Sequence, residues 1–305
     1  CRRRAFARMS RHQPIGTLYH DPGGLLFPYN GPAVTTIHDL SPLHRPEFHP
    51  ADRARRFASE LPETIRRCRL VLTVSEHSRQ DIIQTLGVTP DKVLVIPPGI
   101  DHAIFRPQTA ERVKAVADKY LLRPNGYILS IATLEPRKNL NGLLEAYAML
   151  PLEMRQHYPL VLAGAIGWQA EALQRKIAAY SEIYGQVYYL GYVPQDELPA
   201  LYSGAAVLAF PALDEGFGLP PLEAMACGCP VAANYSGALP ETLGEGAVFA
   251  KDTGAMAMAL QSLIEDELLR KRCIAAGKAR AGLFTWERTA KETVEAYKKA
   301  LGLAP

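Results

Sequence analysis

Short runs of hydrophobic and β-branched residues alternate along the chain with stretches of ten or more residues that have helical spacing. This alternation is typical of βαβ units, in which helices join parallel strands. In the first half it predicts strands at Ala33–His38, Leu70–Val74 and Val93–Ile96, and helices at Asp52–Arg67 and Glu76–Leu86. Three or four strands are too few for a full sheet of six or seven.

The second half predicts a complete sheet of six strands with helices between them. The predicted strands are Tyr127–Ala132, Leu160–Ala163, Val187–Leu190, Val207–Phe210, Val231–Ala233 and Ala247–Phe249. The predicted helices are Glu111–Leu122, Asn139–Met149, Ala170–Tyr184, Asp196–Tyr202, one that begins at Leu219, Thr253–Glu265, Leu268–Ala281 and Trp286–Leu301. Together these elements describe a doubly wound α/β domain.

Proline and glycine gather between the two halves, at Pro97-Pro98-Gly99 and Arg123-Pro124-Asn125-Gly126. The length of 305 residues also exceeds the usual size of one hydrophobic core. We therefore predict an α/β protein with two Rossmann-like domains, residues 1–105 and residues 106–285, and a final helix over residues 286–305.

The net charge is close to neutral, +3 from 34 basic and 31 acidic residues, which gives no indication of a nucleic-acid partner. Arginines nevertheless cluster in two places. They are Arg2, Arg3, Arg4, Arg8 and Arg11, and then Arg53, Arg55, Arg56, Arg66, Arg67 and Arg69. We interpret both clusters as solvated surfaces. The alternative is contact with an anionic bilayer, where each basic residue contributes about 1 kcal/mol.

Cysteine usage and hydropathy indicate a reduced, non-spanning protein. The five cysteines do not form a disulfide or zinc pattern, and we expect Cys227 and Cys229 to be small buried residues. No apolar run approaches the roughly 18 residues that a membrane span requires. The expected location is the cytoplasm. If the arginine clusters bind an anionic bilayer, the protein would also contact the inner face of the plasma membrane peripherally.

Two glutamates frame a glycine-rich loop that follows the fourth predicted strand of the second half. The run is Asp214-Glu215-Gly216-Phe217-Gly218-Leu219-Pro220-Pro221-Leu222-Glu223. Its glycines allow the backbone to approach a ligand, and its prolines suit the first turn of a helix whose N-terminus favours phosphate. Carboxylates accept hydrogen bonds from paired sugar hydroxyls. The alternative is that Glu215 caps the helix and Glu223 is a surface charge.

A cationic turn, Glu135-Pro136-Arg137-Lys138-Asn139, follows the first predicted strand of the second half. Arg137 and Lys138 are both suited to binding phosphate, and would stabilise a diphosphate as it departs. Asn139 is predicted to cap the following helix. The alternative is a solvated basic turn.

Polar residues also end two predicted strands of the first half. His38 and Asp39 follow the first, and a histidine there can donate a hydrogen bond to a sugar oxygen or a leaving group. A purely structural histidine is the alternative. Ser75 follows the second strand, where it is a natural N-cap and, secondarily, a candidate for acceptor contact.

Taken together, these motifs resemble those of the retaining glycosyltransferases of family 4, the group similar to glycogen synthases and bacterial mannosyltransferases. The run from Glu215 to Glu223 matches the family's Glu-x7-Glu element. The other matches are Ala226-Cys227-Gly228-Cys229-Pro230-Val231, Pro240-Glu241, Glu135–Asn139, Pro97-Pro98-Gly99-Ile100-Asp101 and His38-Asp39. They recur in the family's order over nearly the whole chain.

The resemblance implies a GT-B fold, with two Rossmann-like domains facing across a cleft, and a nucleotide-sugar donor. Arg137 and Lys138 would hold the donor diphosphate, Glu215 the transferred sugar and Glu223 the ribose. The backbone around Gly216, Phe217, Gly218 and Leu219, together with Asn139, would complete the donor site. His38 would reach the sugar from the N-terminal domain, with Asp39 and Ser75 on the acceptor side. The last helix would cross back to the N-terminal domain.

The expected reaction is transfer of a hexose to a saccharide or lipid-linked saccharide, with retained anomeric configuration, in surface polysaccharide biosynthesis. GDP-mannose is the favoured donor. No cofactor or metal is expected, because the chain has no Asp-x-Asp element. The family's N-terminal domain usually opens with a strand and a glycine-rich loop; no such opening precedes Gly16, so this domain is expected to be incomplete.

Three other functions fit parts of the pattern. A nucleotide-sugar epimerase or a phosphorylase could share the fold, although no lysine for pyridoxal phosphate is indicated. A non-catalytic sugar-nucleotide-binding subunit is a second alternative. An NAD-dependent dehydrogenase is disfavoured, because no G-x-G-x-x-G motif follows a first strand.

Overall fold

The computed structural model describes residues 6, 13–14, 16–184 and 186–303 of the chain. Its contacts divide the chain into two units. Unit 1 comprises Cys1–Gly99 and Trp286–Pro305, and unit 2 comprises Ile100–Thr285. The predicted boundary, after residue 105, lies six residues further along the chain. No helix among the described residues has the length and apolarity to cross a bilayer.

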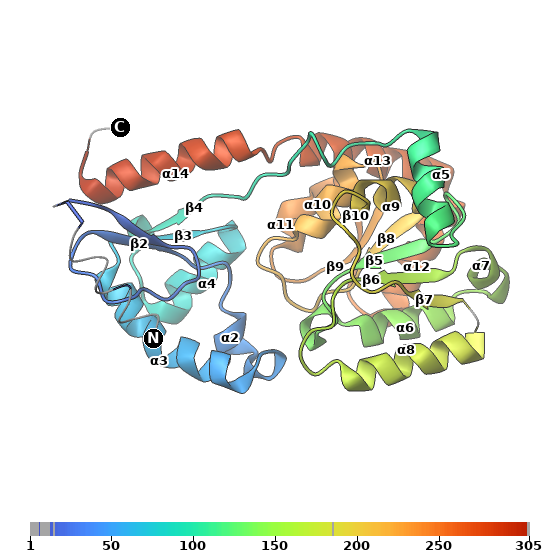
Figure 1. The fold of residues 1–305 in the computed structure, drawn as a ribbon, viewed down its shortest axis with the longest axis horizontal. Helices are drawn as coiled ribbons and strands as arrows, with labels where there is room; N and C mark the ends of the chain where they lie inside the picture. The colour runs from blue at the N-terminus through green and yellow to red at the C-terminus, as the bar shows by residue number, and fades with distance from the viewer. Residues whose placement is uncertain (1–5, 7–12, 15, 185, 304–305) are drawn as a thin grey trace. The chain divides into compact units, whose positions relative to one another are not determined.

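Unit 1 contains a sheet of four parallel strands in the order β1-β2-β3-β4 (Figure 1). The strands are β1 (Tyr19–Asp21), β2 (Ala33–Thr36), β3 (Leu70–Thr73) and β4 (Val93–Val95). The helices are α2 (Ser41–His44), α3 (Ala51–Arg67), α4 (Glu76–Leu86) and α14 (Trp286–Leu301), with 3-10 turns η1 (Pro46–Phe48) and η2 (Pro90–Lys92). The sequence pattern did not reveal β1, since its three residues are polar or aromatic.

The missed strand bears on the expectation that no strand and glycine-rich loop opens the first domain. β1 leads directly into Pro22-Gly23-Gly24, so a strand does precede this glycine pair. The expectation concerned the residues before Gly16, so β1, which begins at Tyr19, does not contradict it. The sequence pattern missed β1 because His20 and Asp21 interrupt any hydrophobic run. Both short strands bond in register, with Tyr19 opposite Ala33 of β2.

The last helix, α14, packs within unit 1. Ala300 joins Val34 and Leu70 in a buried cluster. The guanidinium of Arg69 donates to the backbone oxygen of Ala300 at 2.8 Å. His20 of β1 lies between two hydroxyls, 2.7 Å from that of Tyr297 and 2.8 Å from that of Thr36. These contacts join the two ends of the described chain around one sheet.

The partly buried position of His20 predicts acid sensitivity in unit 1. Burial lowers the pKa of His20 below its ordinary value of 6.5, and Asp21 only partly opposes this. The folded state therefore binds the proton less readily than the unfolded state, so stability is complete above about pH 6.5 and falls below it. We expect His20→Gln to lose less melting temperature than the wild type between about pH 7.5 and about pH 5.5. Equal losses in the two proteins would contradict this.

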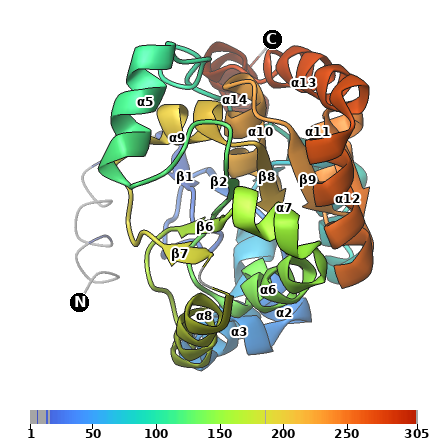
Figure 2. The same ribbon diagram turned by 90° about the vertical axis from the view of Figure 1, so that its right-hand side faces the viewer.

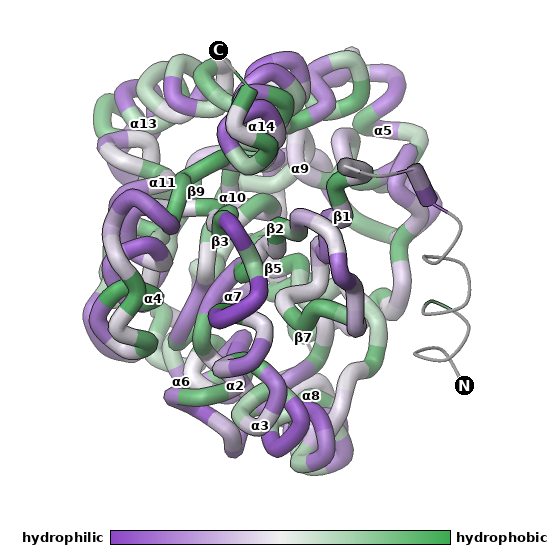
Figure 3. The backbone as a smooth tube through the Cα atoms, turned by 90° about the vertical axis from the view of Figure 1, so that its left-hand side faces the viewer, coloured by the Kyte–Doolittle hydropathy of each residue, from purple (hydrophilic) through white to green (hydrophobic). Residues whose placement is uncertain are grey.

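The helix α3 carries most of the second arginine cluster on its exposed side. Its apolar positions face inward, including Phe57 and Leu61, while most of its arginines are exposed. The alternation of hydrophilic and hydrophobic positions along α3 can be followed in Figure 3. Arg66 pairs with Glu63 at 2.7 Å, and Arg56 with Glu60 at 3.3 Å. Part of this cluster is thus neutralised. The arginines at positions 2, 3, 4, 8 and 11 lie outside the described residues.

Unit 2 contains the predicted sheet of six parallel strands, in the order β10-β9-β8-β5-β6-β7 (Figure 1). The strands are β5 (Ile128–Ile131), β6 (Leu160–Ala163), β7 (Val187–Tyr189), β8 (Val207–Phe210), β9 (Val231–Asn234) and β10 (Ala247–Ala250). The helices are α5 (Ala110–Lys119), α6 (Leu140–Met149), α7 (Leu152–His157), α8 (Glu171–Tyr184), α9 (Leu198–Gly204), α10 (Leu219–Ala226), α11 (Leu239–Leu243), α12 (Thr253–Glu265) and α13 (Glu267–Ala281). Short helices α7 and α11 were not predicted.

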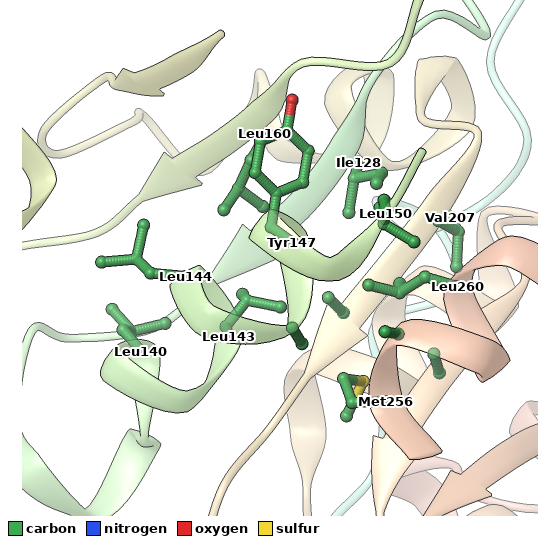
Figure 4. Close-up of a cluster of buried hydrophobic side chains, with 14 of the residues drawn as sticks. Ile128, Leu140, Leu143, Leu144, Tyr147, Leu150, Leu160, Val207, Met256 and Leu260 are labelled. Atoms are coloured by element: carbon green, nitrogen blue, oxygen red, sulfur yellow. The ribbon is translucent and has the colours of Figure 1, made fainter. Parts of the chain in front are cut away.

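Both faces of this sheet are covered. On one face, α6 and α12 bury Leu143, Tyr147 and Leu260 against Ile128 and Leu160 of the strands (Figure 4). The opposite face is covered by helices that include α9 and α10, which are labelled with the sheet in Figure 2. Strands buried on both faces read as continuous hydrophobic runs, which is why their positions were predictable. Cys227 and Cys229 are buried, as predicted.

Candidate functional site

The two motif loops of unit 2 leave neighbouring strands. β5 pairs with β6 on one side and β8 on the other, so the chain turns outward in opposite directions after these two strands. Ligands of open α/β sheets bind at such a reversal of strand order, beyond the carboxyl ends of the strands. The cationic turn follows β5 and the glycine-rich loop follows β8. The topology therefore brings together the two segments that the sequence analysis selected.

The cationic turn is a single 3-10 turn, η3 (Pro136–Lys138), which leads into α6. Asn139 adopts a left-handed conformation, and its side chain accepts a hydrogen bond from the amide of Gly142 at 3.3 Å. The predicted cap is thus confirmed. The amide of Leu213 donates to the backbone oxygen of Arg137 at 2.9 Å. This bond ties the turn to the neighbouring glycine-rich loop.

Four charged side chains meet at this junction. The ammonium of Lys138 lies 2.5 Å from Glu215 Oε2, and Arg137 Nη1 lies 3.8 Å from Glu215 Oε1. Arg137 Nε donates to Glu135 Oε1 at 3.3 Å. The exposed fractions of the four side chains range from 5% to 16%. Since their formal charges cancel, an incoming diphosphate would bring uncompensated negative charge unless Glu215 turned away from the cations.

The prediction that Arg137 and Lys138 bind a diphosphate and Glu215 a sugar did not specify contacts among these three side chains. In the structure Glu215 contacts both cations. These contacts stabilise the Glu215 carboxylate, because a buried charge is costly without a partner.

The first turn of α10 presents free backbone donors. Gly218 is the N-cap, with φ 98°, a left-handed conformation that favours glycine. Among the described residues, none accepts a hydrogen bond from the amides of Phe217, Gly218 or Leu219. Unpaired donors at a helix N-terminus form an anion site. The prolines at 220 and 221 have no N–H, so this site offers fewer donors than an ordinary helix start.

A third segment, residues 234–238, begins at the last residue of β9 and forms hydrogen bonds to the glycine-rich loop and to the residues before it. Asn234 Nδ2 donates a hydrogen bond to the backbone oxygen of Pro211 at 2.8 Å. The hydroxyl of Ser236 donates a hydrogen bond to the backbone oxygen of Ala212 at 2.6 Å. The amide of Ala238 donates to the backbone oxygen of Glu215 at 2.9 Å. Sequence reasoning identified only the neighbouring Pro240-Glu241 match. The polar run itself was a signal, because it follows a strand at the same sheet edge.

Glu223 occupies the second turn of α10, where it is only partly exposed. The hydroxyl of Tyr202 donates to its Oε2 at 3.1 Å. Burial raises the pKa of Glu223, and the bond from Tyr202 opposes that rise. The alternative interpretation of Glu223 as a surface charge is therefore wrong. Glu215 does not cap α10 either, because Gly218 is the N-cap and no side-chain cap bond is present there.

The candidate residues of unit 1 lie beyond β2 and β3. His38 is exposed, and its Nε2 is 3.1 Å from the backbone oxygen of Pro22. Asp39 accepts hydrogen bonds from the amide and hydroxyl of Ser41. Ser75 is 1% exposed. As the N-cap of α4, its side chain accepts a hydrogen bond from the amide of Ser78. Its predicted cap is confirmed, and the predicted acceptor contact stays a prediction.

Within the described part of the chain, no three histidine, cysteine or carboxylate side chains come together in a way that could hold a metal ion. The polar groups that converge at the end of β5 and β8 are instead two cations, two carboxylates and a row of amides. This combination can bind a phosphorylated ligand that also carries hydroxyl groups.

Two family models, both of glycosyltransferases, match successive parts of the chain. Residues 117–280 match the family model described as glycosyl transferases group 1, and residues 4–104 match that of glycosyltransferase family 4. Over 283 residues the chain is 38% identical to O-antigen chain mannosyltransferase B of Escherichia coli, which covers 92% of this chain and 74% of that protein. Over 277 residues it is 35% identical to the serotype-specific mannosyltransferase WbdA of Escherichia coli. This match covers 88% of the chain but only 33% of WbdA.

The fold also resembles that of solved structures. HepE of Anabaena, in complex with UDP-glucose, superposes with a TM-score of 0.76 at 22% sequence identity. The match covers 88% of this chain and 72% of HepE. At that identity the likeness shows a common fold.

Proposed function

The chain belongs to glycosyltransferase family 4, with the two Rossmann-like halves of the GT-B fold, and we propose that it transfers mannose from GDP-mannose. The proposed acceptor is a hydroxyl of a saccharide or lipid-linked saccharide in surface polysaccharide synthesis. The names of the two Escherichia coli relatives support mannose and a polysaccharide product.

One observation carries the proposal: two cations and a row of free amides meet where the strand order reverses. The ammonium of Lys138 and the guanidinium of Arg137 would bind the donor diphosphate together with the amides of Gly218 and Leu219. Glu215 would leave the cations to accept a sugar hydroxyl. Because both cationic side chains are largely shielded from solvent, their electrostatic attraction for the departing diphosphate is stronger than it would be in water.

The proposed reaction retains the anomeric configuration. The bond between the anomeric carbon and the diphosphate oxygen breaks, and that oxygen accepts the proton of the acceptor hydroxyl. The new glycosidic bond forms on the same face of the sugar. No carboxylate in the site is offered as a nucleophile, since Glu215 is proposed to accept a sugar hydroxyl and Glu223 is proposed to hold the ribose. His38 and Asp39 of unit 1 are proposed to contact the sugar and the acceptor.

Metal removal tests the proposed reliance on protein cations. We expect activity to stay within about twofold in excess EDTA, because Arg137 and Lys138 take the role that a divalent ion has in other phosphate-transfer sites. The rate of GDP release from GDP-mannose with an oligomannoside acceptor is the measurement. Loss of activity that Mg²⁺ or Mn²⁺ restores would contradict metal independence, while leaving the family assignment intact.

Donor identity is tested by thermal unfolding with UDP-, GDP-, ADP- and dTDP-sugars. A ligand that binds only the folded protein stabilises it by about 2.7 kcal/mol at a hundred times its Kd. We expect GDP-mannose to raise the melting temperature most. A larger rise with another sugar nucleotide would replace the proposed donor, and no rise with any of them would contradict the proposed function.

A further inference from the structure

A buried phenol holds the carboxylate of Glu223 from the neighbouring helix. Tyr202 lies on α9 and Glu223 on α10, two helices in contact on one face of the sheet (Figure 2). The Tyr202 side chain is fully buried, and its hydroxyl donates to Glu223 Oε2 at 3.1 Å. Within the described residues, this is the single donor to the Glu223 carboxylate. Oε1 therefore keeps its lone pairs for other donors.

Among the residues that the structure describes, no positive charge compensates the Glu223 carboxylate. Burial raises its pKa, and the hydrogen bond from Tyr202 is the one opposing influence. The nearby thiol of Cys227, on the same helix, stays neutral because burial raises its pKa to about 12. Cys229, close enough to influence the pKa of Tyr202, is likewise neutral because burial raises its own pKa. The phenol thus stabilises the anionic carboxylate without neutralising it.

We propose that Tyr202 is a positioning residue that fixes the Glu223 carboxylate to accept the two adjacent hydroxyls of the donor ribose. This role rests on the proposed function, since it requires a nucleotide donor. A carboxylate accepts two hydroxyls together only when its plane is held in one orientation. The Tyr202 bond sets that plane, because Tyr202 is itself immobilised by complete burial.

The test compares two nucleotides that differ only in the ribose hydroxyls. Wild-type protein and Tyr202→Phe are titrated calorimetrically with GDP and with 2′,3′-dideoxy-GDP. Loss of a hydrogen bond to a charged group weakens binding by about tenfold. We therefore expect Tyr202→Phe to bind GDP about tenfold more weakly and dideoxy-GDP within about twofold of the wild type. The acid limb of the GDP-binding profile should also move to higher pH, because Glu223 loses its hydrogen-bond donor.

Tyr127→Phe is the matched control. Tyr127 is also fully buried, and its hydroxyl donates to the backbone oxygen of Leu201, the residue before Tyr202, at 2.7 Å. Removing this hydroxyl disturbs the same helix without touching Glu223. We expect a lower melting temperature with an unchanged ratio of GDP to dideoxy-GDP affinity.

The outcomes separate this role from the function on which it rests. Equal weakening of both nucleotides by Tyr202→Phe would show a merely structural role and overturn the proposal. Unchanged GDP binding by Tyr202→Phe, in a protein that still transfers mannose, would also overturn it and leave the proposed function standing. Failure of the wild type to bind any nucleoside diphosphate would overturn both.

Discussion

Replacing Lys138 with alanine is expected to lower kcat by about 10²–10³-fold, the usual effect of removing one donor to a developing oxyanion. The ammonium lies 2.5 Å from Glu215 and over the ring of Phe210, 5.4 Å from its centroid. It is therefore fixed at the edge of β8, where the proposed diphosphate departs. Steady-state kinetics with GDP-mannose as donor measure the effect.

Lys176→Ala is the matched control for Lys138→Ala. Lys176 pairs with Glu145 at 2.7 Å in the same unit, but their side chains are 31% and 53% exposed, respectively. Its loss is expected to change kcat by less than about twofold, since exposed ion pairs contribute about 0–1 kcal/mol. Melting curves show whether each variant is folded. Near-normal turnover by a folded Lys138→Ala protein would reject the role of Lys138 in stabilising the leaving group.

Gly237→Ala is expected to lower kcat by about 10²-fold, the effect of displacing a reacting group by about 1 Å. A Cβ at this position would lie 2.4 Å from the backbone oxygen of Glu215 and 2.8 Å from its amide nitrogen. Because these are backbone atoms, no side-chain rotation can relieve the overlap. The loop that carries Glu215 must move, and the φ of 52° adds strain. Kinetics and melting temperature are measured together.

Gly87→Ala separates this displacement from strain alone. Gly87 also has a positive φ, 63°, but a Cβ there would meet nothing within 4 Å. Its substitution is expected to cost about 1–2 kcal/mol of stability through the left-handed conformation, with kcat unchanged. If both variants lost the same stability and neither lost activity, the segment after β9 would have no part in positioning Glu215.

The sequence predicted the fold of unit 2 more completely than that of unit 1. Strands such as β6 and β8 are buried on both faces, so their hydrophobic runs ended where the strands end. β1 was missed because it has three residues, of which His20 and Asp21 are polar. Its position depends on pairing with β2 and on contact with α14, which local pattern does not report.

The candidate site was predictable as a set of residues but not as a set of contacts. The loops after β5 and β8 could be selected because both follow strands and combine cations, glycines and carboxylates. The pairing of Lys138 with Glu215 could not be predicted, since it depends on which strands become neighbours. For the same reason, neither the bonds from Asn234 and Ser236 nor that from Tyr202 could be predicted from local sequence.

The central claim concerns where the donor diphosphate is bound, and a crystal structure of the complex with GDP tests it most directly. The account predicts phosphate oxygens within hydrogen-bond distance of Lys138 Nζ and of the amides of Gly218 and Leu219, with the Glu215 carboxylate turned away from Lys138. A complex in which Glu215 remains on Lys138 and the phosphates lie elsewhere would contradict it.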